Sequence, residues 1–306
     1  MFDKTKYESF RLFKDEGFEN GFNVNRIMNG PDGYIPIGKW TFPESRHEPS
    51  WILIQWYSKH CFINERKQTE PYIIADTSDT KKVVYNPLEK SLSMTLNARN
   101  VYKGEPRLSG MWPHLLIEQR HICPDYKNKS QEERRFYSAE CDRIVAEMDI
   151  RLTEYLPTTN PEGINACQFV AYVYLQFVDG NFIYLGFNPF DDRGPIEFLW
   201  KKETGGPNMI YSLPTEITFG SIENSFNAGG SVNASDEWKH IEVDLTSHIQ
   251  RVVDTANRDL IFGRKVSRDE FYFSGTNVGF EIHGNISCTM EIKNYNLVTY
   301  RLKEKF

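Results

Sequence analysis

Charged and apolar side chains alternate along residues 146–153, Ala-Glu-Met-Asp-Ile-Arg-Leu-Thr. Because successive side chains of a β-strand point to opposite faces, Glu147, Asp149 and Arg151 would share one face and the apolar residues the other. Neighbours on such a face lie about 7 Å apart, which suits groups that hold sugar hydroxyls or that pair an acid with a base. The alternative is a solvated sheet face whose charges neutralise one another.

Ionisable side chains also occur along residues 112–121, Trp-Pro-His-Leu-Leu-Ile-Glu-Gln-Arg-His. In a strand, one face of this stretch carries His114, Glu118 and Arg120, and the other carries Gln119 and His121. We expect the first set to face away from the core, because burying a glutamate and an arginine costs more free energy than burying a glutamine and a histidine.

If these two strands are neighbours, Glu118 and Glu147 form the carboxylate pair that glycoside hydrolysis uses. One carboxyl group protonates the leaving oxygen, and the other attacks the sugar carbon or activates water. His114, Arg120 and Arg151 would then bind substrate. The structural alternative is a set of cross-strand ion pairs between glutamate and arginine.

Three further residues are candidates for substrate binding. Trp112 stands beside a proline and a charged strand, so it is the preferred platform for stacking on a sugar ring, whereas most other tryptophans are expected in the core. Glu281 and His283 share one face of the predicted strand at residues 278–283. A histidine in such a place is more often structural than catalytic.

Asp191 and Asp192, in Asn-Pro-Phe-Asp-Asp-Arg-Gly, offer oxygen ligands for a structural calcium ion. The alternative is an ordinary turn, since the pattern of an EF-hand is absent. The sequence also lacks G-x-S-x-G, a phosphate-binding glycine loop and H-E-x-x-H. Their absence argues against the common hydrolase elbow, nucleotide binding and metalloprotease chemistry, and no cofactor is expected for catalysis.

The elements that position these residues are predicted to be strands. From about residue 34, short runs rich in β-branched and aromatic residues are separated by turn residues, and Asp179-Gly180 marks a hairpin. Strands that follow one another without helices between them pair antiparallel. Two segments show signals of a helix: a serine cap at Ser130, and apolar residues at helical spacing over residues 246–260. We therefore predict an all-β, antiparallel two-sheet sandwich with one or two short peripheral helices.

The 306 residues are predicted to form an extended lead-in over residues 1–30 and a single domain over residues 31–306. A net charge of -6 without runs of like charge argues against nucleic acid or a membrane as a partner. The five cysteines are odd in number and scattered, which indicates reduced thiols. We expect a cytoplasmic protein, or a secreted one if an export signal was removed. The oligomeric state stays open.

These charged strands, together with residues 238–245 and 279–295, resemble the concanavalin A-like lectin/glucanase superfamily over most of residues 34–300. The resemblance implies a jelly roll that binds sugar on its concave face. Glu147-Met-Asp149 is similar to the first half of the strand motif of family 16 glycoside hydrolases, which implies a helper role for Asp149. Gln119-Arg-His121 is similar to the Q-x-H motif of alginate-type lyases.

Three hypotheses for function follow, all with a carbohydrate ligand. The first is a glycoside hydrolase that acts on a poly- or oligosaccharide with paired carboxylates in the concave groove. The second is a non-catalytic carbohydrate-binding module that uses the same groove and Trp112. The third is a uronate lyase built around Gln119, His121 and Arg151.

Overall fold

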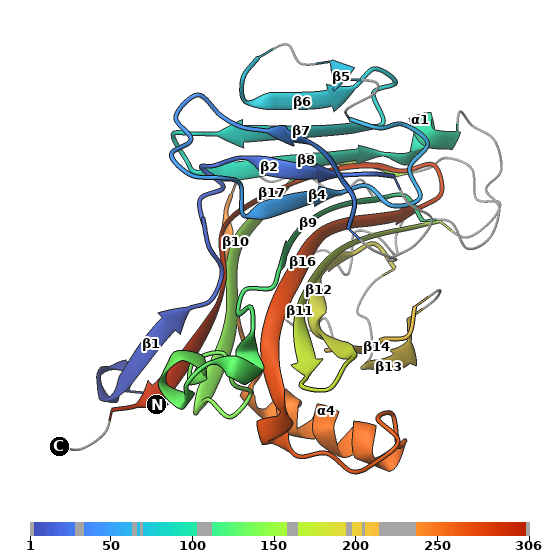
Figure 1. Cartoon of the computed structure of the whole chain (residues 1–306). Coiled ribbons are helices and arrows are strands. Elements are labelled where there is room, and N and C mark those ends of the chain that lie inside the picture. The colour runs from blue at the N-terminus through green and yellow to red at the C-terminus, as the bar shows by residue number, and fades with distance from the viewer. Residues whose placement is uncertain are drawn as a thin grey trace.

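The computed structural model describes most of the chain as two stacked sheets (Figure 1). The described residues are 3–27, 34–62, 66–67 (backbone alone), 70–102, 112–157, 165–193, 198–203, 206–213 and 237–303. Both sheets consist mainly of antiparallel pairs, as the runs of short strands predict, and the parallel pairs in sheet B are β2 with β4 and β12 with β14. The predicted antiparallel two-sheet sandwich is therefore confirmed.

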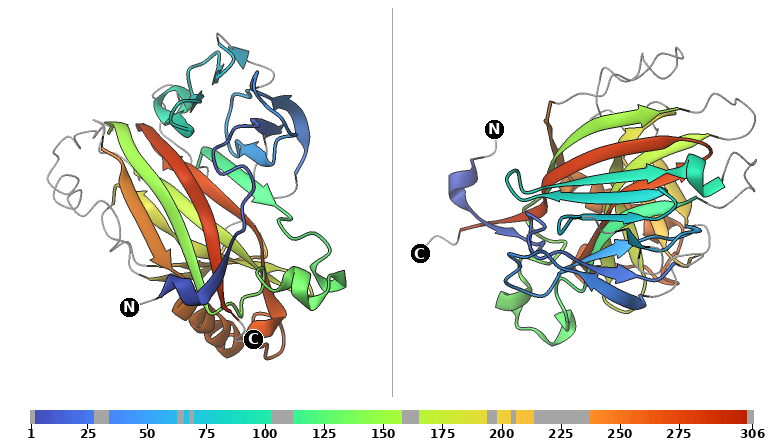
Figure 2. Two further views of the ribbon diagram at one scale, coloured as in Figure 1. Left: turned by 90° about the vertical axis from the view of Figure 1, so that its left-hand side faces the viewer. Right: turned by 90° about the horizontal axis from the view of Figure 1, so that it is seen from above.

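Sheet A has eight strands in the described part of the chain. In spatial order they are β15 (Lys239–Asp244), β10 (Arg143–Leu156), β17 (Ser287–Leu302), β8 (Ser91–Asn97), β7 (Lys81–Asn86), β6 (Ile73–Asp76) and β5 (Arg66–Lys67), with β1 (Tyr7–Arg11) paired to β17. The long strands β10 and β17 run side by side along the molecule (Figure 2).

Sheet B has nine strands in the same described residues. In spatial order they are β13 (Leu199–Lys202), β14 (Met209–Ser212), β12 (Phe182–Asp191), β11 (Ala166–Phe177), β16 (Phe271–His283), β9 (His114–Arg120), β4 (Trp51–Ile54), β2 (Phe22–Asn25) and β3 (Pro36–Trp40). The predicted hairpin is present, since β11 and β12 pair antiparallel across the turn that contains Gly180. The lead-in at residues 1–30 contributes β1 to sheet A and β2 to sheet B.

The main hydrophobic core lies between the sheets and shows which way each strand faces. From sheet A, alternate residues of β10 from Ile144 to Leu152 enter it. From sheet B, Leu115 and Ile117 of β9 do the same. Because side chains alternate, the residues between these point away from the core, out of the outer faces of the two sheets.

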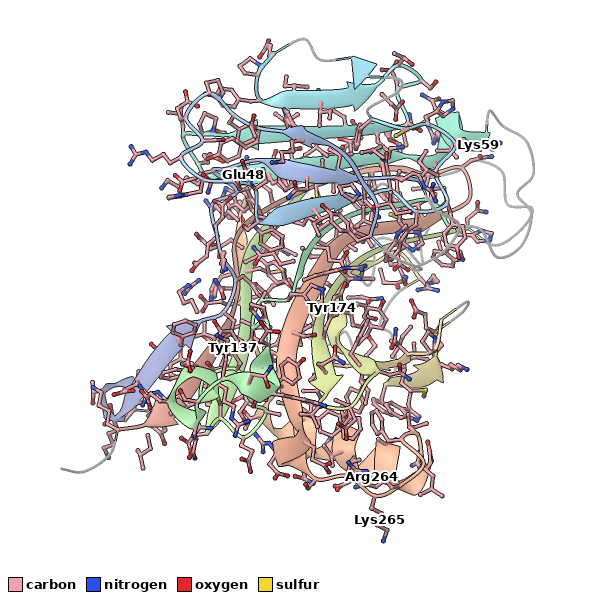
Figure 3. The ribbon with its side chains drawn as sticks, in the orientation of Figure 1. Glu48, Lys59, Tyr137, Tyr174, Arg264 and Lys265 are labelled. Atoms are coloured by element: carbon pink, nitrogen blue, oxygen red, sulfur yellow. The ribbon has the colours of Figure 1, made fainter. Side chains whose placement is uncertain are left out.

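A second, smaller apolar cluster lies on the outer face of sheet B. It contains Ile52, Ile54, Trp56, Leu116 and Val170. Figure 1 shows the strands of sheet B bending around the side on which β13 and β14 lie. Tyr174, which Figure 3 labels, also belongs to this face and is buried. The outer face of sheet B is therefore concave and partly covered, as a binding face requires.

Helices are short and peripheral, as predicted. They are α1 (Ala98–Tyr102), α2 (Gln131–Arg134) and α4 (Thr246–Arg258), with 3-10 turns at Lys4–Lys6, Tyr126–Asn128 and Arg268–Glu270. Helix α2 begins at Ser130, whose side chain and that of Glu133 form the expected capping box. Helix α4 buries an apolar stripe that includes Ile249 and Val253. None of the described helices has the length and apolar character that a membrane span requires.

Candidate active site

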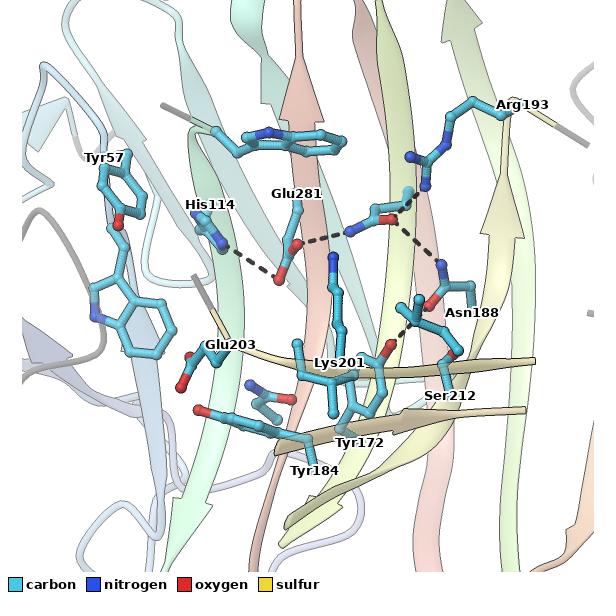
Figure 4. Close-up of a pocket in the computed structure, with 16 residues that line it drawn as sticks. Tyr57, His114, Tyr172, Tyr184, Asn188, Arg193, Lys201, Glu203, Ser212 and Glu281 are labelled. Carbon is cyan, nitrogen blue, oxygen red and sulfur yellow. Dashed lines mark hydrogen bonds and ion pairs between the residues drawn. The ribbon is translucent and has the colours of Figure 1, made fainter. Parts of the chain in front are cut away.

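A pocket of about 480 Å³ opens on the concave face of sheet B (Figure 4). Its floor is formed by side chains of the strands β9, β11, β12 and β16, and one wall by the edge strand β13 and its neighbour β14. The loop after β4 adds Trp56 and Tyr57 at the opposite wall. Pockets of roughly 300–1,000 Å³ with aromatic walls and a few convergent polar groups are typical ligand sites.

Glu281 stands on β16 in the floor of this pocket. Its Oε2 accepts a hydrogen bond from Gln168 Nε2 at 2.7 Å, and its Oε1 lies 3.3 Å from His114 Nε2. Burial alone would raise the pKa of this carboxyl group, but His114, Gln168 and the charge of Lys201 together lower it below its ordinary value. Glu281 is therefore held as a carboxylate.

The amide of Gln168 is oriented by its other partners. Its Oε1 accepts a hydrogen bond from Arg193 Nη2 at 2.7 Å and a longer one from Asn188 Nδ2 at 3.3 Å. Because these donors require an oxygen, the amide nitrogen must be the end that faces Glu281. Arg193 is held in turn by Asp191, with Nε–Oδ1 at 2.8 Å and Nη2–Oδ2 at 2.5 Å. A chain of charge-assisted hydrogen bonds thus fixes the carboxylate.

Glu203 enters the same pocket from the end of β13. Burial raises the pKa of Glu203 to about 7, and Glu281 adds to the rise, although Asn208 and Tyr184 offer hydrogen bonds that oppose it. Within the part of the chain that the structure describes, its buried Oε2 has no hydrogen-bond partner. Figure 4 shows the carboxyl group beside the Tyr184 hydroxyl. Glu203 therefore holds its proton in mildly acidic solution.

The strand that leads to Glu203 is held in place by a contact on the face that points away from the pocket. Leu199, Lys201 and Glu203 face the pocket, and Trp200, between them, faces away from it. The indole of Trp200 donates a hydrogen bond at 2.8 Å to Asp259, which caps the C-terminal end of α4. The helix therefore helps to hold β13 against the pocket.

Gly206 leaves room for the Glu203 carboxyl group. A Cβ atom at Gly206 would lie 2.3 Å from Glu203 Oε2, so Gly206→Ala must displace that group. We expect the displacement to expose the carboxyl group to water and to lower its pKa from about 7 toward the ordinary value of 4.5, measured by NMR titration of the Glu203 side-chain carbon. Gly180→Ala is the matched control, because a Cβ atom there meets no atom within 4 Å. An unshifted pKa in Gly206→Ala would contradict this packing.

Of the residues predicted from the sequence, Trp112, His114 and Glu281 line the pocket. Trp112 stands over it with the Arg193 guanidinium 5.7 Å from its ring centroid. His283 is buried next to the pocket, and its ring packs edge-on against Trp112 at 5.2 Å between centroids. The two histidines thus have different environments, one facing the pocket and one supporting its tryptophan.

Glu118 and Arg120 lie on the concave face, as expected, but deeper than the pocket lining. Glu118 is fully buried, and its Oε1 accepts hydrogen bonds from Arg120 Nε at 2.6 Å and from the Tyr174 hydroxyl group. The structural alternative was ion pairs between strands, whereas this pair joins two residues of β9. Glu118 faces away from the core as expected, but it does not escape burial.

The expected pair of Glu118 and Glu147 is wrong, because the two residues lie on different sheets and face opposite sides of the sandwich. β9 pairs with β16 and β4, whereas β10 pairs with β17 and β15. On the outer face of sheet A, Glu147 forms an ion pair with Arg11 and Asp149 lies 2.7 Å from His240 Nδ1. The alternation along each strand was predicted correctly, but their adjacency was not.

Arg151 belongs to the same outer face of sheet A, where its Nε donates to Glu291 at 2.8 Å. Gln119 faces the core side of β9 and is held by the backbone of Lys14, whose N–H lies 3.1 Å from Gln119 Oε1. His121 follows the strand with a φ of 53° and is exposed. The lyase arrangement of Gln119, His121 and Arg151 is therefore not formed.

Asp191 and Asp192 do not fit the expected calcium site. The oxygens of Asp191 accept hydrogen bonds from Arg193, which already supplies the cation. Asp192 accepts from Cys167 N at 2.8 Å and from the Tyr155 hydroxyl at 3.0 Å, and burial raises its pKa to about 6. Over the described ranges, no three His, Cys, Asp or Glu residues are grouped as metal ligands.

Several pocket residues were not predicted from the sequence. Gln168 and Tyr172 could have been found, because period-two alternation along residues 166–177 places them opposite the core residues Phe169 and Val173. Lys201 and Glu203 gave no such signal, since β13 is only four residues long and its place at the pocket depends on long-range pairing.

No family model matches the chain, and no curated protein matches it. Among solved structures, it is similar to the xyloglucanase domain of NopAA, a type three effector from Sinorhizobium fredii, in complex with cellobiose. The two sequences are 8% identical, the match covers 72% of this chain and 86% of that chain, and the TM-score is 0.39. It is also similar to a family 12 xyloglucanase from Bacillus licheniformis (9% identity, 77% and 98% covered, TM-score 0.36) and to endoglucanase Cel12A from Rhodothermus marinus (11% identity, 75% and 91% covered, TM-score 0.36). Likenesses this distant say nothing about the chemistry of the pocket.

Proposed function

We propose that the protein hydrolyses a glycosidic bond in the pocket on sheet B, with Glu203 as the general acid and Glu281 as the ionised carboxylate. The observation that carries the proposal is that two carboxyl groups line one pocket in contrasting environments. Glu203 Oε2 is buried and has no hydrogen-bond partner among the described residues, whereas Glu281 is held by Gln168 and His114, so their pKa values are pushed in opposite directions. Glycoside hydrolysis requires this combination, since one group must give a proton while the other stays charged.

The reaction follows from these protonation states. Glu203 gives its proton to the glycosidic oxygen as the bond to the anomeric carbon breaks. Glu281 supports the positive charge that develops at that carbon, either by attacking it or by taking a proton from an attacking water molecule. Retention or inversion of configuration in the product, measured by NMR, distinguishes the two routes. His114 and Gln168 keep the carboxylate oriented in either case.

The walls of the pocket suit a sugar ring. Trp56, Tyr57 and Trp112 provide apolar ring faces, against which the C–H face of a sugar packs. Asn188, Ser212 and Asn277 add neutral polar groups that can bond to hydroxyl groups. This mixture of aromatic and amide side chains supports carbohydrate as the ligand.

The pH dependence tests the proposal on any glycan that a panel screen shows to be cleaved. As pH rises through about 7, Glu203 loses the proton that it must give, so kcat/KM should fall with an apparent pKa near 7. On the acid side activity should persist below pH 4.5, because the pKa of Glu281 is lowered. Activity that rises between pH 6 and pH 8 would contradict Glu203 as the acid.

A carbohydrate-binding module is the second candidate, favoured by the same aromatic walls. The panel separates the two functions, because it records both retention of each glycan and release of product. Retention without product across the panel would support binding alone.

A further inference from the structure

A lysine and an arginine line the pocket, and they differ in their partners. Arg193 is neutralised by Asp191, to which it donates two hydrogen bonds from its guanidinium group. Lys201 forms no such close pair: its charge acts on Glu281, but in the described part of the chain no carboxylate oxygen lies within 4.0 Å of its Nζ and no hydrogen bond of that atom is found. The pocket therefore presents one ammonium group that is available to a ligand.

The direction of Lys201 is set by its strand. Trp200 and Lys202 lie on the opposite face of β13, and Trp200 is tied to Asp259 at the end of α4. Lys201 consequently extends into the pocket toward Glu281, where Figure 4 shows its ammonium group. Lys201 is exposed to solvent in the open pocket, so its ammonium group is accessible to an anionic substituent of a ligand that lies beside Glu281.

We propose that the substrate is an acidic glycan and that the Lys201 ammonium binds a carboxylate or sulfate group on the sugar beside Glu281; this rests on the proposed hydrolase function. A bound sugar displaces water from Lys201. A neutral sugar would leave the ammonium group with hydroxyl partners only, whereas an anionic substituent forms a charge-assisted hydrogen bond. Lys201 also stands where it can offset the repulsion between that substituent and Glu281.

The test is calorimetric titration of Glu203→Gln protein at about pH 5.5, where the amide replaces an acid that is protonated in the wild type. The probes are three oligosaccharides of equal length: a neutral β-glucan, one that contains uronic acid and one that carries sulfate. We expect at least one anionic probe to bind roughly 3- to 10-fold more tightly than the neutral probe at low salt, with the difference shrinking as salt is added.

Lys201→Met in this background is expected to remove the preference, and Lys201→Arg to keep it. Lys202→Met is the matched control, because it removes the same charge from the exposed opposite face of the same strand and should keep the preference.

Preference for the uronic acid probe identifies a carboxylate, and preference for the sulfated probe identifies a sulfate. Equal binding of all three probes, or a preference that survives Lys201→Met, would overturn this inference alone. Failure of every probe to bind would overturn the proposed function with it.

Discussion

Glu281→Gln is expected to lower kcat/KM by roughly 10³-fold on any glycan that the wild-type protein cleaves. The amide has nearly the size of the carboxylate, so the fold should be kept. It has no negative charge with which to attack the anomeric carbon or to take a proton from water. Initial rates of product release at a fixed pH near 5.5 measure the loss, and circular dichroism checks that the fold is intact.

The acid gives a different pattern, which separates the two roles. Glu203→Gln should lose activity comparably on natural glycans, whose leaving groups need a proton, but should keep most of it on a dinitrophenyl glycoside, whose leaving group does not. The fall in activity above about pH 7 should also disappear, since the group whose pKa is about 7 has been replaced. Glu281→Gln should stay inactive both on the dinitrophenyl glycoside and above pH 7.

Glu147→Gln serves as the matched control, because Glu147 lies on the outer face of sheet A in an ion pair with Arg11. Its kcat/KM should stay within about twofold of the wild type, since β10 belongs to sheet A and Glu147 does not line the pocket. Full activity in Glu281→Gln, or a large loss in Glu147→Gln, would remove the pocket on sheet B from the mechanism.

The scaffold could be predicted from the sequence because its signals are local. Alternation along β10 sends Met148 and Ile150 into the core and Glu147 and Asp149 outward, and the same alternation on β9 separates Glu118 from Gln119. Turn residues such as Gly180 mark where strands end. These features depend on residues within one strand or one turn, so they can be read from the chain itself.

Strand adjacency depends on distant segments, and the candidate site was therefore only partly predicted. Glu281 and His114 were identified as facing one side of their strands, and β16 does pair with β9, opposing Glu281 to His114. Glu147 was assigned to the same site, although its strand belongs to the other sheet. Glu203 was missed because it follows an edge strand that pairs only with β14 in the described residues.

Lys81→Met is expected to lower the free energy of unfolding by about 3–5 kcal/mol. Lys81 is fully buried with Asp76, 3.7 Å from Nζ to Oδ2. Removing the lysine leaves the aspartate charge buried with hydrogen bonds from Ser78 and Thr80 but without a cation. Urea denaturation of the variant and the wild type, analysed by linear extrapolation, measures the difference.

The same lysine holds the loop that carries the aromatic wall of the pocket. Its Nζ donates hydrogen bonds to the Ser58 hydroxyl and to the His60 carbonyl oxygen. Tyr57, next to Ser58, has a φ of 54°, a left-handed conformation that a tyrosine adopts only where its surroundings enforce it. Loss of Lys81 should therefore weaken glycan binding as well as stability, because Tyr57 lines the pocket.

Lys82→Met provides the control, since Lys82 is the next residue of β7 and points outward into solvent. It should change the free energy of unfolding by no more than about 0.5 kcal/mol. Adding Asp76→Asn to Lys81→Met should recover part of the stability, because the double variant leaves no unpaired charge in the interior. Equal stability of Lys81→Met and Lys82→Met would show that the pair of Lys81 and Asp76 is not buried. A stable Lys81→Met that still binds glycan would show that other contacts hold the aromatic loop. One such contact is the 3.2 Å hydrogen bond from Phe62 N to Gln55 Oε1.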